Sequence, residues 1–250
     1  MIKVILLFLS LFSAGFAFSQ SQVTFNRKYD REVLINTVNG NSLIENDSGY
    51  LTANLIWRPN SFGKLWLMQV DFYGDTLWNK VYGDSLSGDN YQARAIVKSV
   101  DSPNYFLGGT HGSYLAMKDS GMLIKFNNSG DILWERKIQL APRSTVGWDM
   151  IKSSKEELVF VGNNYDFHPV WQYVNIGACA YAFDTSGNLL WNRTYTHGIG
   201  NQFLLELVET PDKGFIMCGY SYFGPSGNNA DFWVIRTDST GNVIWENFYG

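Results

Sequence analysis

The sequence predicts an all-β fold assembled from about four copies of one unit, and three observations lead to this prediction. Tryptophan recurs about every 55 residues, each time four residues after a glycine. The segments around it are short, rich in β-branched and aromatic residues, and bounded by Gly, Asn, Asp and Ser, as strands are. No segment keeps the hydrophobic period of a helix. The recurring residues are Trp78, Trp134, Trp191 and Trp245.

Residues 1–19 have the pattern of a signal peptide. A lysine at position 3 precedes an apolar run over 4–12, and small residues occupy the two positions that a signal peptidase reads, so cleavage is expected before Gln20. A membrane anchor is the alternative, but a span needs about 20 apolar residues and serine and glycine interrupt this run. We therefore expect an exported protein, secreted or on the cell surface, whose mature chain 20–250 has no membrane span.

The amino-acid composition limits the classes of binding partner to be expected. A net charge of −4 argues against nucleic acid, which needs a basic surface to displace counterions, and against anionic lipid. Two cysteines are too few for a disulfide scaffold, so the fold must depend on its apolar core. When the repeats are aligned on their tryptophans, Cys179 takes the place of Trp66, Met122 and Trp233, which predicts a core position. We expect Cys179 and Cys218 to be buried thiols; a disulfide between neighbouring repeats is the alternative.

Each repeat is predicted to contain four strands. First strands are expected at 42–45, 92–98, 148–153 and 203–209, and second strands at 50–55, 105–110, 158–163 and 215–220. Third strands are expected at 65–70, 122–126, 179–183 and 232–237, and fourth strands at 77–82, 133–138, 190–195 and 243–249. Four short antiparallel strands about every 55 residues are the blade plan of a β-propeller. A β-sandwich would not explain the repetition. The repeats cover about 31–83, 84–140, 141–197 and 198–250.

The turn before each fourth strand carries the motif Asx-x-x-Gly-Asx. Its lead residues are Asp71, Asn127, Asp184 and Asp238, and its glycines are Gly74, Gly130, Gly187 and Gly241. The lead side chain is expected to accept backbone N–H bonds, and the glycine to supply a positive φ. A calcium loop is disfavoured because its alternating ligands are absent. The tryptophan that follows is predicted to fill the wedge between neighbouring sheets.

The N-terminal residues 23–30 look like a fourth strand without the three that should precede it, because Phe25 lies about one repeat before Trp78. Propellers often close by letting an N-terminal strand complete the last blade, which removes exposed strand edges. The last repeat already has a fourth strand. We therefore expect these residues to be part of a larger propeller of five blades or more, with a closed four-bladed ring as the alternative.

Three motifs carry a resemblance to a known family. They are Leu107-Gly108-Gly109, the run Asn127-Asn128-Ser129-Gly130-Asp131 ahead of Trp134, and Trp78-Asn79-Lys80-Val81-Tyr82-Gly83. Together they resemble the repeats of secreted Bacteroidetes-type β-propeller proteins. The third repeat departs, because Val161-Gly162-Asn163 lacks the second glycine and Thr196 follows Tyr195. The resemblance implies a propeller and export by type IX secretion, and it implies no activity.

The repeats are also distantly similar to those of quinoprotein-type propellers. Enzymes of that group use pyrroloquinoline quinone, a vicinal cysteine pair and calcium. Cys179 and Cys218 are not vicinal, so we expect neither a cofactor nor a metal. A zinc site of His111, His168 and His197 is disfavoured because they fall on three different blades.

Ligand binding is expected on the face that carries the loops between second and third strands and between blades. Flat rings with polar tips suit a glycan or an extended polypeptide, although the same rings could serve only to pack the loops. The candidate ligand-binding residues are Trp57, His111, Tyr114, Tyr165, His168, Trp171, Tyr173 and Tyr222.

We therefore expect an exported, non-enzymatic propeller that binds a glycan or an extracellular protein. One alternative is a polysaccharide-acting hydrolase, which needs two carboxylates about 5–10 Å apart. Its candidates are Asp119, Asp149, Asp166 and Asp231. The other alternative is a structural spacer in a larger surface protein. No catalytic residue is assigned, because nucleophile-elbow, zinc-protease and phosphate-loop motifs are absent from the sequence. The sequence predicts no oligomeric state.

Overall fold

The computed structural model describes residues 37–57, 63–83, 89–100, 102–113, 118–138, 144–168, 172–197, 200–223 and 229–250. The predicted signal peptide 1–19, the strand-like segment 23–30, Tyr114 and Trp171 lie outside these ranges. Regular structure within them is entirely β. No helix in this part of the chain could span a bilayer.

The strands form four antiparallel sheets, here called blades 1 to 4. Blade 1 contains β1 (Thr37–Asn46), β2 (Gly49–Trp57), β3 (Lys64–Val70) and β4 (Thr76–Tyr82). Blade 2 contains β5 (Asp89–Lys98), β6 (Asn104–Ser113), β7 (Lys118–Asn127) and β8 (Ile132–Ile138). Blade 3 contains β9 (Ser144–Lys152), β10 (Leu158–His168), β11 (Gln172–Phe183) and β12 (Leu189–Tyr195). Blade 4 contains β13 (Gln202–Glu209), β14 (Phe215–Phe223), β15 (Asn229–Thr237) and β16 (Val243–Tyr249).

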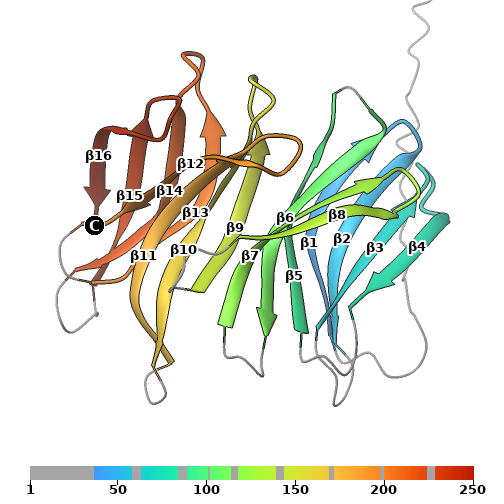
Figure 1. The fold of residues 1–250 in the computed structure, drawn as a ribbon, viewed down its shortest axis with the longest axis horizontal. Coiled ribbons are helices and arrows are strands. Elements are labelled where there is room, and N and C mark those ends of the chain that lie inside the picture. The colour runs from blue at the N-terminus through green and yellow to red at the C-terminus, as the bar shows by residue number, and fades with distance from the viewer. Residues whose placement is uncertain are drawn as a thin grey trace, which may run out of the picture.

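Consecutive blades pack face to face in chain order. Figure 1 shows the sheets side by side, from blade 1 in blue and teal to blade 4 in dark red. The first strand of each blade contacts the first strand of the next, so β1, β5, β9 and β13 line the inner side of the assembly. Buried side chains form one apolar core between blades 1 and 2, another between 2 and 3, and a third between 3 and 4. The predicted all-β propeller of four-stranded antiparallel blades is confirmed by this topology.

The hairpins between second and third strands are longer than the sequence predicted. Pairing of β6 with β7 continues to Ser113 opposite Lys118, and pairing of β10 with β11 continues to His168 opposite Gln172. The segments 111–120 and 164–177 were expected to be loops, and most of their residues are in strands. Two adjacent strands that extend beyond a sheet satisfy each other's backbone N–H and C=O groups by continuing to pair. The identity of the turn residues alone does not show how far this pairing continues.

The turns before the fourth strands have the predicted chemistry. Asp71 Oδ1 accepts the backbone N–H groups of Tyr73 and Asp75 at 2.9 and 2.8 Å, and the other three lead residues repeat this pattern. The motif glycines Gly74, Gly130, Gly187 and Gly241 have φ of 82°, 83°, 84° and 79°. A non-glycine residue would be strained there.

The recurring tryptophans lie between blades, against the turn glycine of the following blade. A Cβ atom on Gly130 would lie 2.7 Å from the Trp78 ring, and one on Gly241 would lie 2.7 Å from the Trp191 ring. The corresponding distance from Gly187 to Trp134 is 3.1 Å. The predicted wedge role is therefore confirmed for these three indoles. Glycine is needed at each of these turns for two reasons: a Cβ atom would clash with the neighbouring indole, and the backbone has a positive φ.

Polar contacts accompany two of these wedges. The Tyr82 hydroxyl donates to the carbonyl of Gly130, and the Tyr195 hydroxyl donates to that of Gly241 at 2.9 Å. Lys80 pairs with Asp131, and Arg193 Nε donates to Asn242 Oδ1 at 3.1 Å. The Asx after the motif glycine thus receives a bond from the preceding blade.

Trp245 departs from the predicted wedge role. Its side chain is 40% exposed, and Tyr249, at the position of Tyr82 and Tyr195, is 57% exposed. The described residues supply no turn glycine opposite this indole.

Each innermost strand carries a β-bulge at the same register. The residues left out of the ladder are Asn41 in β1, Arg94 in β5, Trp148 in β9 and Leu205 in β13. The partner strand approaches closely here, because a Cβ on Gly109, Gly162 or Gly219 would lie 2.1 Å or less from a backbone carbonyl oxygen of the innermost strand. A bulge redirects a side chain without ending the strand.

This register corrects one detail of the sequence alignment. Gly162 pairs with Gly147 beside the bulge, as Gly109 pairs with Ala93. Gly162 is therefore the equivalent of Gly109, and the third repeat lacks the first glycine of the pair, which Val161 replaces.

The cysteines are not joined by a disulfide. Cys179 is fully buried and pairs with Gly162, as Met122 pairs with Gly109 and Trp233 with Gly219, so its predicted core position is confirmed. Cys218 is also a free thiol, but it is half-buried, so the expectation that it is buried is wrong.

The wedge role of the indoles predicts an unequal response to truncation. Trp78→Ala removes a ring packed on the next blade and is expected to lower the free energy of unfolding by about 2–4 kcal/mol. Trp245→Ala removes an exposed ring and is expected to cost about 1 kcal/mol or less. Urea denaturation followed by tryptophan fluorescence and circular dichroism measures both. Equal destabilisation by the two substitutions would contradict the wedge role.

Candidate functional site

A pocket of about 270 Å³ lies where the innermost strands of blades 2, 3 and 4 begin. It is therefore on the face of the hairpin loops and blade connections, where the sequence predicted a site. Its lining combines aromatic, amide and charged side chains with aliphatic ones. The lining residues are Gln92, Arg94, Thr110, Asp119, Val146, Trp148, Asn163, Tyr165, Ile176 and Phe203.

Two bulge residues from neighbouring blades meet in this pocket. The Arg94 guanidinium lies over the Trp148 ring, with its central carbon 4.4 Å from the ring centroid. This cation–π contact is worth about 0.5–2 kcal/mol. Trp148 Nε1 donates to Asn163 Oδ1 at 2.5 Å, and Asn163 Nδ2 donates to the Gln202 carbonyl of blade 4 at 2.6 Å. The indole is thus fixed by blades 2, 3 and 4 together.

The Arg94 charge is only partly compensated. Its Nη2 donates to Gln92 Oε1 at 3.0 Å, while the buried Nε–H has no hydrogen-bond partner. No carboxylate of the described residues forms an ion pair with Arg94. Burial alone lowers the pKa of this guanidinium from its ordinary value of 12.5, and no neighbouring anion opposes the effect. The side chain stays charged at neutral pH.

Asp119 is the carboxylate among the lining residues. It accepts a hydrogen bond from the Tyr165 hydroxyl, which joins blade 2 to blade 3. Burial raises the pKa of the Asp119 carboxyl above 3.8, and the bond from Tyr165 opposes this rise. A partly desolvated carboxylate of this kind can accept hydrogen bonds from ligand hydroxyl groups.

Phe203 connects the pocket to an aromatic cluster on blade 4. Its ring stacks on Tyr220 with centroids 4.6 Å apart and makes a T-shaped contact with Tyr222, with centroids 6.2 Å apart. All three rings are half-buried. The apolar wall of the pocket therefore continues outward along blade 4.

Two of the predicted residues with described side chains contribute to this region directly. Tyr165 lines the pocket, and Tyr222 belongs to the cluster behind Phe203. Both lie in strands, β10 and β14, where the sequence predicted loops.

His111 lies in β6 and is 3% exposed. Its ring meets Tyr91 edge-on at 4.6 Å, and its Nε2 is 3.7 Å from Asp89 Oδ1 without a hydrogen bond. Burial is the main cause of the lowered pKa of His111, so the ring is neutral at pH 7. His111 is therefore a buried neighbour of the pocket rather than part of an exposed rim.

The remaining predicted site residues fall at the edges of the described ranges. Trp57, His168 and Tyr173 are placed in β2, β10 and β11 by their backbones only, and Tyr114 and Trp171 lie outside the described residues. His197 follows β12 and has Nδ1 3.1 Å from Glu246 Oε1. No cluster of potential metal ligands occurs in the described part of the chain.

The sequence analysis missed Arg94 and Trp148. Both were assigned to predicted strands, and strand periodicity gives no sign that either is displaced from the ladder. One signal was available, because Asn41, Arg94, Trp148 and Leu205 recur at nearly the spacing of the tryptophans while differing in chemistry. Such a position recurs at the same place in every repeat but holds a different residue type each time. This indicates that the fold does not require a particular side chain there.

The hydrolase candidates are distributed differently from a catalytic pair. Asp119 lines the pocket, whereas Asp149 is absent from its lining and accepts backbone N–H bonds from Met150 and Leu207 at 2.8 and 3.2 Å. Burial raises the pKa of Asp149, and the two bonds oppose the rise. Asp149 thus joins β9 to β13. Asp166 and Asp231 are not among the lining residues either.

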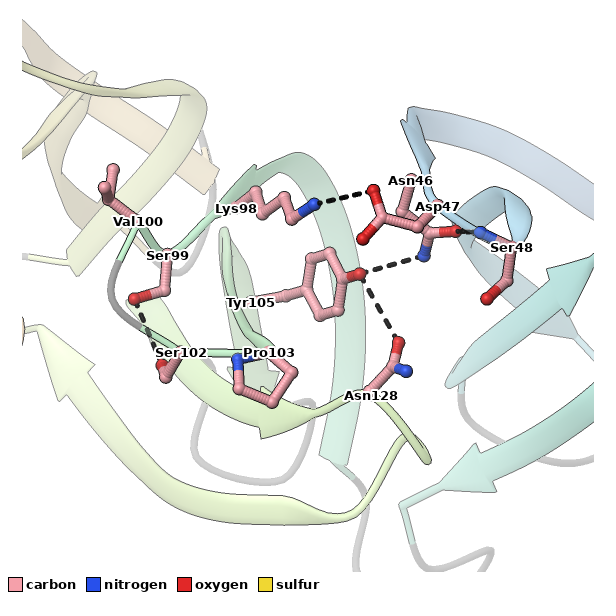
Figure 2. A pocket seen from close by; sticks show the side chains of 10 residues that line it. All are labelled: Asn46, Asp47, Ser48, Lys98, Ser99, Val100, Ser102, Pro103, Tyr105 and Asn128. Carbon is pink, nitrogen blue, oxygen red and sulfur yellow. Dashed lines mark hydrogen bonds and ion pairs between the residues drawn. The ribbon is translucent and has the colours of Figure 1, made fainter.

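A second hollow, of about 330 Å³, lies on the opposite face, between the turns of blades 1 and 2. Figure 2 shows that its polar groups bind one another. Tyr105 Oη accepts from Asn46 Nδ2 at 2.9 Å and donates to Asn128 Oδ1 at 3.4 Å, and Lys98 Nζ lies 3.4 Å from Asp47 Oδ1. These bonds link two blades, so we take the hollow as a structural junction.

No protein-family model matches the sequence, and no curated protein matches it significantly. Among solved structures, the chain is similar to a subtype N10 neuraminidase-like protein of A/little yellow-shouldered bat/Guatemala/060/2010 (9% identity, TM-score 0.47, covering 84% of this chain and 66% of that one). It is also similar to an N-acetylgalactosamine deacetylase from F. plautii in complex with blood group B trisaccharide (9%, 0.46, 88% and 71%). A third is a periplasmic gluconolactonase, PpgL, from Pseudomonas aeruginosa (12%, 0.43, 84% and 70%).

The chain spans 55% of the length of another solved match, a eukaryotic initiation factor with 10% identity and a TM-score of 0.38. Identities this low, with TM-scores below 0.5, assign neither an activity nor a ligand to this chain.

The raised pKa of Asp119 predicts a pH-dependent stability difference. Its ionised form is less favourable in the folded than in the unfolded state, so the group opposes folding as pH rises through the raised pKa. Asp119→Asn removes that cost and keeps an acceptor for Tyr165. The free energy of unfolding of the variant, relative to wild type, is expected to increase as the pH rises from about 3.5 to about 7. Urea titrations across this range measure it, and a difference that falls with pH would contradict the expectation.

Proposed function

We propose that this protein is an exported binding protein that holds a glycan segment in the pocket where blades 2, 3 and 4 meet. The observation that carries the proposal is the pairing of two bulge residues, Arg94 and Trp148, in a pocket lined by further rings. A bulge costs ladder hydrogen bonds, and here it places a cation and an indole where they add nothing to a blade core.

The pocket has the chemistry that a sugar requires. Trp148 and Phe203 are half-buried and present aromatic surface that suits the apolar faces of sugar rings. Gln92 and Asp119 are also half-buried and supply amide and carboxylate groups for hydroxyls. A few convergent polar groups in a pocket with aromatic and aliphatic walls are typical of small-molecule sites.

Export is supported by the sequence of residues 1–19 and by the resemblance of the repeats to secreted Bacteroidetes-type propellers. Periplasmic or extracellular polysaccharide would then be available to the pocket. Fractionation of cells that express the full chain, with N-terminal sequencing of the exported form, tests this part. Retention of an unprocessed chain in the cytoplasm would contradict it.

Hydrolysis is less well supported than binding. A glycosidase needs two carboxylates at the scissile bond, and the ten lining residues include one, Asp119. An extracellular protein remains the alternative ligand, because the same rings and amides suit an extended peptide.

Binding through the pocket is tested with a glycan array and the mature chain 20–250. Wild type is expected to bind a set of glycans, and Trp148→Ala is expected to weaken that binding about 10- to 100-fold, because it removes the stacking surface and releases Arg94. The matched control is Tyr73→Ala, which removes a ring that is 63% exposed in a turn on the opposite face. A blank array with wild type, or equal binding by both variants, would contradict the proposal.

A further inference from the structure

We infer that Arg94 makes the pocket selective for a carboxylate, so that its ligand is an acidic glycan containing uronic acid. This inference rests on the proposed function and narrows it. The pocket supplies the aromatic contacts of a saccharide site, and Arg94 adds a positive charge that no carboxylate of the described residues pairs with.

Arg94, Arg136 and Arg193 form no ion pair with a carboxylate of the described residues, and of these three only Arg94 has a buried N–H group without a hydrogen-bond partner. Lys80, Lys98, Lys152 and Arg236 each pair with a carboxylate. Within the part of the chain that the structure describes, Arg94 has one hydrogen bond, to a neutral amide, and its cation–π contact with Trp148. A partly buried charge is unfavourable unless it is paired, and stacking offsets only part of the cost of desolvation. A bound anion would supply the missing partner.

The geometry favours a planar anion over a spherical one. The guanidinium has five N–H donors in one plane, and its central carbon lies 4.4 Å from the centroid of the Trp148 ring. At the edge of this plane, two parallel N–H groups match the two oxygens of a carboxylate. A sugar ring attached to that carboxylate would extend toward the aromatic wall at Phe203.

Asp119 does not cancel this selectivity. It lines the same pocket, yet it binds Tyr165 and forms no ion pair with Arg94. The pocket thus separates an acceptor for hydroxyls from a donor for an acid group. A uronic acid presents both kinds of group on one ring, whereas an acidic peptide side chain presents the carboxylate without the hydroxyls.

The test uses isothermal titration of the mature chain 20–250 with matched pairs of oligosaccharides. The probes are trimers of galacturonate, glucuronate and mannuronate, each beside its carboxyl-reduced neutral counterpart, and triglutamate as the peptide probe. Wild type is expected to bind at least one acidic trimer about 10- to 100-fold more tightly than its neutral counterpart.

Substitution at Arg94 separates charge from shape. Arg94→Met keeps much of the apolar stem on Trp148 and is expected to lower the ratio of acidic to neutral affinity to about one. Arg94→Lys keeps the charge without the planar fork and is expected to retain only part of the preference. Circular dichroism and the urea midpoint establish that each variant is folded.

The outcomes distinguish this inference from the proposed function. Equal binding of acidic and neutral trimers by wild type, or an acid preference that survives in Arg94→Met, overturns the carboxylate assignment and leaves glycan binding intact. If wild type binds neutral glycans and no acidic ones, the carboxylate assignment is likewise overturned and glycan binding is left intact. Tighter binding of triglutamate than of every trimer overturns the glycan assignment, and failure to bind any trimer or array glycan overturns both.

Discussion

The contact between a fourth-strand indole and the turn glycine of the next blade is the constraint on which the rest of this structure depends. Trp78, Trp134 and Trp191 each fill the space against a glycine that has no Cβ to exclude them. This contact fixes the separation of successive sheets at their outer ends, while the innermost strands fix it at the other. The indole–glycine contact and the contact between innermost strands together determine how each blade is placed against the next one.

Glycine therefore has two separate tasks in each repeat. The motif glycine of the turn allows a left-handed backbone and admits an indole from the neighbouring blade. The glycine of the second strand, as at Gly109 and Gly162, allows that strand to approach the bulged innermost strand. The first task holds the blades together, and the second permits a side chain to leave the ladder. The packing of the blades and the proposed binding site thus depend on different glycines of the same repeat.

The fold followed from the sequence because its signals are local and repeated. A turn motif, an alternating strand pattern and a constant period each identify neighbours within one blade, and chain order then gives the sheets. The positions of Asp71 and its equivalents, and the core position of Cys179, could be read in this way. The lengths of the hairpins could not be predicted in this way, because the pairing of β10 with β11 beyond Asn164 depends on both strands extending together.

The site was only partly predictable, for a physical reason. Tyr165 and Tyr222 were predicted because aromatic residues near a loop face stand out in the sequence, but Arg94 and Trp148 owe their place in the pocket to an extra residue in a strand. A bulge shifts the direction of one side chain without changing the hydrophobic pattern on either side of it. His111 illustrates the opposite error, since a residue type that often performs chemistry is here buried beside Tyr91.

The bulges have one further consequence. Asn41, Arg94, Trp148 and Leu205 occupy the same station in four successive modules, outside the hydrogen-bonded ladder. Exchange of such a residue leaves the contacts between fourth-strand indoles and turn glycines intact, so its identity can vary without loss of those contacts. Substitutions at these four bulge positions can therefore be combined without changing the fold. New recognition properties can arise in this way on the same architecture.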